Sequence, residues 1–195
     1  TLQNGMRVIV IEDDRVPAVS HNLLFPLGAA DDARGKSGLA HYLEHMMFQG
    51  SYTLKAGEYS RTVAEKGGQS NAFTSADYTG YWVNIAKEEL PTVMELEADR
   101  LSDLDPSDAD FAREKKVILE ERRMRVDNSP NALFGEQMNA ALYLHYPYGT
   151  PIIGWAEEMA ALGKPEVREY FDRFYHPKNA VLIISGDVTV DEVRE

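Results

Sequence analysis

The segment His41-Tyr42-Leu43-Glu44-His45 carries the strongest structural signal in the sequence. It lies in a stretch that we expect to form a helix over residues 37–48, with Ser37 as its N-cap. Residues three and four apart share one face of a helix. At about 100° per residue, His41, Glu44 and His45 fall within one arc of about 100°. The segment therefore predicts a helix that presents two imidazoles and a carboxylate to the same point.

This order of residues is the reverse of the His-Glu-x-x-His zinc motif, and the reversed form is itself a known metallopeptidase signature. Zinc binds neutral imidazoles, and the chemistry needs a carboxylate near the metal but not on it. That carboxylate takes a proton from water and later passes it to the leaving amine. The alternative is a solvated helix that carries two histidines and a glutamate. The chain has only 5 histidines, and two of them stand at metal-binding spacing, which argues against this alternative.

A third ligand is expected from the charged segment at residues 113–121. Glu114 and Glu121 are separated by two turns of helix and therefore share a face. The apolar residues between them, Val117 and Ile118, would help to bury that face. Glu120 points elsewhere. The alternative, an exposed charged helix, fits four other residues of this region: Lys115, Lys116, Arg122 and Arg123.

The remaining pattern alternates between strands and helices. Strands are predicted over residues 6–11, 18–25 and 180–185, with a hairpin formed by residues 69–74 and 78–85. Helices are predicted over residues 58–66, 88–104, 107–126, 132–144 and 166–175, and loops over residues 28–35 and 145–154. This order indicates an α+β fold, with helices packed on one face of a mostly antiparallel mixed sheet. One domain is expected over residues 1–195, cut short near its C-terminal end within the first turn of a helix.

Composition narrows the function. A formal net charge of −12 argues against nucleic acid and anionic membrane surfaces as partners. No apolar run approaches the length that crosses a bilayer. The chain has no cysteine, so any metal must bind to histidine, aspartate or glutamate. The lack of cysteine neither requires nor rules out an oxidising compartment, so periplasm and cytoplasm both remain open.

Several chemically attractive residues are interpreted as structural. His21, His145 and His176 are expected to pack or to serve loops. Met46-Met47 is expected to belong to the core. The two acidic pairs, Asp13-Asp14 and Asp31-Asp32, are typical of turns and loops.

With these residues in place, the chain resembles the pitrilysin/insulinase (M16) family of zinc metallopeptidases, in particular the N-terminal, metal-binding half of bacterial members. The likeness covers nearly the whole chain, through the motif and its flanks (residues 38–40 and 46–51), residues 68–75, 98–100, 145–149 and 175–179. The resemblance implies that His41, His45 and Glu121 bind Zn²⁺. It also implies that Glu44 is the general base and that Glu114 supports the site.

Residues 68–75 resemble the substrate-binding edge strand of that family. This implies that Asn71, Ala72 and Phe73 bind peptide by adding it to the sheet edge. The alternative is an ordinary paired strand of the hairpin.

The resemblance predicts a zinc-dependent endopeptidase or oligopeptidase that hydrolyses extended peptides by zinc-activated water. Its partners would be the peptide substrate and a second homologous half, in the same natural chain or in another subunit. That half would add an arginine and a tyrosine, so this half alone is expected to be weak or inactive. The alternative is a non-catalytic structural or assembly subunit of the same fold.

Overall fold

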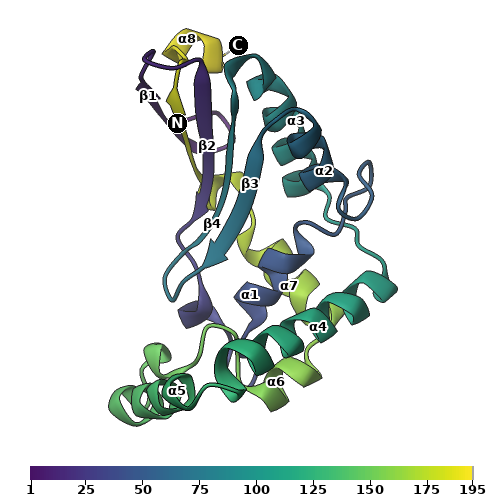
Figure 1. The fold of residues 1–195 in the computed structure, drawn as a ribbon, viewed down its shortest axis with the longest axis vertical. Helices are drawn as coiled ribbons and strands as arrows, with labels where there is room; N and C mark the ends of the chain where they lie inside the picture. Colours follow the sequence, from purple (N-terminus) through teal and green to yellow (C-terminus); the bar gives the residue numbers. More distant parts are fainter. Residues whose placement is uncertain (195) are drawn as a thin grey trace.

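The computed structural model describes residues 1–194 and is built around one mixed five-stranded sheet (Figure 1). Its strands are β1 (Arg7–Glu12), β2 (Ala18–Phe25), β3 (Gln69–Thr74), β4 (Thr79–Ala86) and β5 (Val181–Gly186), in the order β1-β5-β2-β4-β3. Strand β5 pairs in parallel with β1, and the pairings of β2 with β5, β2 with β4 and β3 with β4 are antiparallel. The predicted mostly antiparallel mixed sheet is confirmed.

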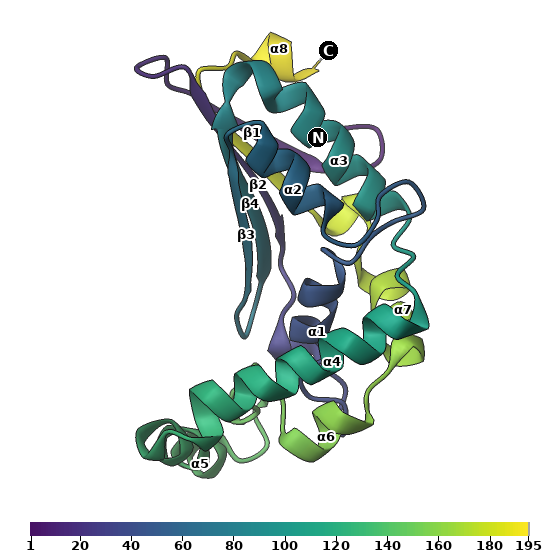
Figure 2. The same ribbon diagram turned by 45° about the vertical axis from the view of Figure 1, so that its right-hand side comes forward.

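Helices gather on one face of the sheet, as Figure 2 shows most clearly. The helices nearest the sheet are α1 (Leu39–Met46), α2 (Glu58–Glu65), α3 (Leu90–Ser102) and α7 (Lys164–Phe174). Beyond the end of the sheet lie α4 (Asp108–Arg122), α5 (Pro130–Tyr143) and α6 (Ala156–Ala161), and α8 (Val190–Arg194) follows β5. Within residues 1–194, none of these helices has the length and apolar character needed to span a membrane.

The core lies between the sheet and these helices. Strand β2 shows why: Val19, His21, Leu23 and Phe25 alternate along the strand and are buried, whereas Ser20, Asn22 and Leu24 between them are half-buried. Helix α1 adds Leu43 and Met46, which are fully buried. Burying one such side chain stabilises the fold by about 1.5–3 kcal/mol. Met47 is buried as well, so the prediction that the Met46-Met47 pair belongs to the core is confirmed.

The start of α1 differs from the prediction. Gly38, with φ of 86°, is the N-cap in place of Ser37. Ser37 is buried, and its hydroxyl accepts a hydrogen bond from the Trp155 backbone N–H at 2.9 Å. A β-carbon at position 38 would stand 2.8 Å from the Ile153 carbonyl oxygen, so only glycine fits this left-handed turn.

Helix α4 also differs. One continuous helix was predicted over residues 107–126, but the α-helix ends at Arg122 and a π-helical turn, Arg123–Asp127, follows it. Arg122 was expected in solvent but is buried, where it pairs with Glu136 and donates to the Gly154 carbonyl oxygen at 2.7 Å. Lys115 likewise turns inward and donates to the carbonyl oxygen of Leu162 at 2.7 Å. Helix α6, which is six residues long, was not predicted because so short a helix shows little periodicity.

Candidate metal centre

A cleft of about 820 Å³ opens between the motif helix α1 and the edge strand β3. Helices α4 and α5 and residues 151–153 complete its walls. Every residue that the sequence singled out for metal, catalytic, supporting or peptide-binding roles lines this cleft: His41, Glu44, His45, Asn71, Ala72, Phe73, Glu114 and Glu121. The fold therefore brings two helices and a strand, distant in sequence, around one space.

The buried side of helix α1 fixes the helix's orientation. Tyr42 and Leu43 anchor the helix in the core, and the Tyr42 hydroxyl donates to the Phe111 carbonyl oxygen of α4 at 2.6 Å. Because positions one turn apart share a face, anchoring this side directs His41 and His45 into the cleft. The two imidazole rings lie edge to face with their centres 4.7 Å apart.

Glu121 of α4 completes a group of three side chains whose ligand atoms all lie within 4.8 Å of one another. Glu121 Oε2 lies 3.7 Å from His41 Nε2 and 3.4 Å from His45 Nε2. Ligands about 2.1 Å from a tetrahedral zinc ion are separated by about 3.4 Å. Two imidazole nitrogens and one carboxylate oxygen are a zinc donor set, and these spacings fit the ion.

The protonation of His41 suits a metal ligand. Burial, together with smaller effects of the neighbouring His45 and Arg125, lowers the pKa of His41 to about 3. The ring is therefore neutral near pH 7 and offers a lone pair, the form that metals bind. Its Nδ1 is buried and has no hydrogen-bond partner among residues 1–194.

Glu121 is oriented by Arg125, one turn further on in the π-helical segment. Arg125 Nη1 lies 2.6 Å from Glu121 Oε1, the oxygen that does not face the histidines. Sequence reasoning did not select Arg125. The spacing of four residues between a glutamate and an arginine on one helix was the available signal.

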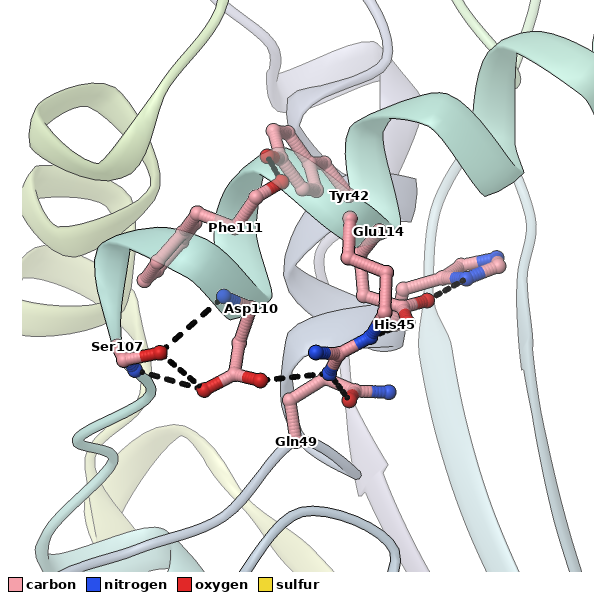
Figure 3. A network of polar contacts seen from close by, with 8 residues as sticks. Tyr42, His45, Gln49, Ser107, Asp110, Phe111 and Glu114 are labelled. Carbon is pink, nitrogen blue, oxygen red and sulfur yellow. Dashed lines mark hydrogen bonds and ion pairs between the residues drawn. The ribbon is translucent and has the colours of Figure 1, made fainter.

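Glu114 lies behind His45, on the side away from Glu121. Its Oε2 is 3.4 Å from His45 Nδ1, and its Oε1 is 3.7 Å from Arg113 Nε. Arg113 in turn pairs with Asp110 at 2.6 Å and donates to Gln49 Oε1 at 2.7 Å. Figure 3 shows this network from the start of α4 to His45. A carboxylate in this position can fix both the tautomer and the orientation of a ligating imidazole.

Glu44 lies beside the histidines but leans toward β3. Its Oε2 accepts a hydrogen bond of 2.5 Å from the hydroxyl of Thr74, the last residue of that strand. Burial raises the pKa of Glu44, while the Thr74 bond and His45 oppose that shift. A carboxylate with a raised pKa is suited to exchanging a proton near neutrality. Thr74 was not selected from the sequence, because nothing local reveals that β3 ends at this carboxylate.

Within residues 1–194, strand β3 is an edge of the sheet and pairs only with β4. Ala72 lies opposite Tyr81 in that pairing, and its backbone N–H donates to the side chain of Asn71 at 2.9 Å. Alternate residues of an antiparallel strand direct their N–H groups away from the partner strand. We infer that the Ala72 N–H faces the open edge beside the cleft.

Four other residues considered from the sequence lie outside the group of ligands. Glu120 is exposed and pairs with Arg123, as expected. Val117 is 46% exposed in the cleft wall, so it does not help to bury this face of α4, whereas Ile118 is fully buried. His21 is buried in β2 near Glu97 and Arg100, as expected for a packing residue.

Comparison with known proteins gives a consistent result. The profile of the family described as "Insulinase (Peptidase family M16)" matches residues 7–155, and that of the "Peptidase M16 inactive domain" matches residues 161–195. The zinc protease PqqE of Helicobacter pylori is 33% identical over 196 residues, covering 100% of this chain and 44% of the relative. An uncharacterized zinc protease of Mycobacterium leprae is 31% identical, covering 99% of the chain and 43% of the relative.

A solved structure of a related protease has the same fold. The crystal structure of a protease from Helicobacter pylori superimposes with a TM-score of 0.96 at 33% identity, covering 100% of this chain and 47% of that one. The chain thus spans less than half the length of the curated relatives that it matches.

Proposed function

Because the chain belongs to peptidase family M16, the insulinase family, we propose that it is the zinc-binding part of a metallopeptidase that hydrolyses peptide bonds of extended peptides. One observation carries the proposal: His41, His45 and Glu121 converge from two helices on one point, with Glu44 beside them. The names of the relatives, zinc proteases, support zinc as the metal. Activity of the whole protein is part of the proposal, since the chain spans 44% of its relative.

Each residue has a distinct role. The imidazoles of His41 and His45 and one carboxylate oxygen of Glu121 would hold the ion. Zinc, when bound, supplies a Lewis acid and makes water acidic enough to deprotonate near neutral pH. Glu44 accepts the proton from the attacking water and passes it to the nitrogen of the leaving amine. Its raised pKa and its place outside the ligand group favour this role.

Two further residues orient the ligands. Glu114 accepts from His45 Nδ1, which directs Nε2 of that ring toward the metal. Arg125 holds the outer oxygen of Glu121 and so directs the inner one. In other proteins, mutation of residues that orient metal ligands in this way typically lowers metal affinity by about 10–100-fold.

The substrate lies against β3. A peptide that adds to this edge would run past Asn71, Ala72 and Phe73, with main-chain bonds for affinity and alternate side chains directed into the cleft. The Ala72 N–H is the donor on that edge, and a bound peptide carbonyl would replace the Asn71 side chain as its acceptor.

A second homologous half would close the other side of the cleft. With one wall only, substrate is less well positioned and the reacting groups remain in water. The isolated chain is therefore expected to bind zinc but to cleave peptides slowly.

The decisive experiment compares the whole protein with its Glu44→Gln variant, using a library of quenched fluorescent peptides and elemental analysis for zinc. Both should hold about one zinc per chain, and only the parent should cleave. An amide keeps the shape of the carboxylate but cannot take the proton. A zinc-loaded parent that binds peptides yet cleaves no better than Glu44→Gln would show a non-catalytic subunit instead.

A further inference from the structure

Helix α1 begins without a capping side chain of its own. It is eight residues long, so its first turn is a large part of it, and the first N–H groups of any helix need acceptors from outside. Its N-cap is Gly38, which has no side chain. Nor could another residue stand there, because φ is 86° and a β-carbon would meet the Ile153 carbonyl oxygen at 2.8 Å. The acceptors must therefore come from elsewhere in the chain.

Asp32, six positions before Gly38 in the chain, supplies them. Its Oδ2 accepts from the backbone N–H groups of Gly38 at 2.8 Å and Leu39 at 3.1 Å, and its Oδ1 accepts from that of Ala40 at 2.9 Å. A negative charge at this end is also stabilised by the positive, N-terminal end of the helix dipole. Burial raises the pKa of Asp32 to about 7, against the three N–H donors that lower it. In either protonation state its oxygens can accept hydrogen bonds.

The position of His41 makes this cap relevant to the metal. His41 is the third residue of α1 and belongs to the turn that Asp32 holds, whereas His45 lies one turn further on. A frayed first turn would move His41 Nε2 away from Glu121 Oε2, which is 3.7 Å distant, before it disturbed His45. Metal affinity falls in proportion to the fraction of molecules in the binding-competent form.

We propose that Asp32 is a positioning residue of the metal centre, which acts through the first turn of α1 to keep His41 in its ligating position. The proposal rests on the proposed function, in that it takes His41, His45 and Glu121 as zinc ligands. Asp32 itself is not one of the residues that line the cleft. This role goes beyond the interpretation from the sequence, in which Asp31-Asp32 was an acidic pair typical of a loop.

The neighbouring residue provides a matched control. Asp31 Oδ2 accepts from the Gly28 N–H at 2.8 Å and caps the short 3-10 helix Ala29–Asp31, with no bond to α1. Asp31→Ala and Asp32→Ala therefore each remove a carboxylate from the same loop. Asp32→Ala removes the cap of the helix that carries His41, whereas Asp31→Ala removes the cap of a different helix.

The test measures zinc affinity by competition with a chromophoric chelator, using metal-free protein that circular dichroism shows to be folded. Asp32→Ala should weaken zinc binding by about 10-fold or more, the range seen when partners that orient ligands are lost. Asp32→Asn, which keeps one oxygen acceptor, should weaken it less, and Asp31→Ala should stay within about twofold of the parent on the same scale. Hydrogen exchange at the amides of residues 38–40 should be faster in both Asp32 variants.

Two results would overturn the proposal: an affinity of folded Asp32→Ala within twofold of the parent, or equal losses in Asp31→Ala and Asp32→Ala. If Asp32→Ala does not fold, Asp32→Asn decides on the same criterion, with unchanged affinity counting against the proposal. A parent chain that binds no zinc would instead refute the proposed function, and the two failures are thereby distinguished.

Discussion

The Thr74 hydroxyl donates a hydrogen bond of 2.5 Å to Glu44 Oε2 and so joins the end of the edge strand β3 to the motif helix α1. The bond lies where the strand proposed to bind peptide meets the proposed base. It ties the Glu44 carboxylate to the end of the edge strand. The proposed peptide-binding edge and the proposed base therefore share one contact.

Thr74→Val should lower kcat of the whole enzyme by about 10-fold or more, because a hydrogen bond to a charged group is worth about 1.5–3 kcal/mol and 1.4 kcal/mol is a factor of ten. Thr74→Ser keeps the hydroxyl and should remain within about threefold of the parent. Zinc content should be unchanged in both, since Thr74 does not belong to the ligand group. Equal activity of the valine and serine variants would show that the hydroxyl does not position Glu44.

Glu121→Gln should weaken zinc binding strongly, because zinc then loses one of its three protein ligands. Glu120→Gln is the matched control, since that side chain is exposed, pairs with Arg123 and points away from the histidines. Chelator competition on the metal-free chains measures the difference. Full zinc occupancy in Glu121→Gln together with loss in Glu120→Gln would mean that the ligand is the neighbouring residue.

Ala72→Pro should abolish binding of an extended peptide and leave zinc binding intact. Proline removes the backbone donor, and it is tolerated at an edge where the N–H faces away from the sheet. Fluorescence anisotropy with a labelled peptide, on zinc-loaded Glu44→Gln protein so that nothing is cleaved, gives the affinity. A folded Ala72→Pro variant with the parent's peptide affinity would contradict the edge-strand proposal.

Glu136→Ala should lower the free energy of unfolding by about 3 kcal/mol, the lower end of the range for breaking a buried ion pair, because the more exposed Asp127 remains 3.4 Å from Arg122 Nη2. Arg122 and Glu136 have side chains only 6% and 7% exposed, and both Arg122 Nη atoms donate to Glu136. Glu120→Ala breaks the exposed pair with Arg123, whose side chains are 51% and 56% exposed, and should cost less than about 1 kcal/mol. Urea unfolding of the metal-free variants measures both, and equal effects would argue against a structural role for the Arg122–Glu136 pair.

Stability should fall in acid partly through His21. Burial lowers its pKa, Arg100 lowers it further, and Glu97 opposes the shift. Below about pH 6.5 the unfolded chain takes up a proton at this residue that the folded chain does not, so the free energy of unfolding decreases by up to about 1.4 kcal/mol per pH unit. His21→Gln should reduce the slope of stability against pH between 7 and 5. An unchanged slope would mean that His21 takes up its proton over the same pH range in the folded and the unfolded chain.

Local periodicity determined several features from the sequence alone. The helix over the motif follows from residues 41, 44 and 45, because a repeat of 3.6 residues places them on one face in any fold. Strand β2 was predicted with the bounds that it has, and its buried residues, Val19, His21, Leu23 and Phe25, recur at every second position as in any strand with one face in the core. The α+β class and the M16 resemblance were confirmed.

Only the tertiary structure decided what stands around those residues. Thr74 meets Glu44, Asp32 reaches the start of α1, and Arg122 is buried against Glu136, none of which local spacing predicted. The insertion of β5 between β1 and β2 is of the same kind, because it joins residues more than a hundred positions apart. Local repeats determine which face a side chain occupies, but the neighbours that it meets depend on how whole faces are buried together.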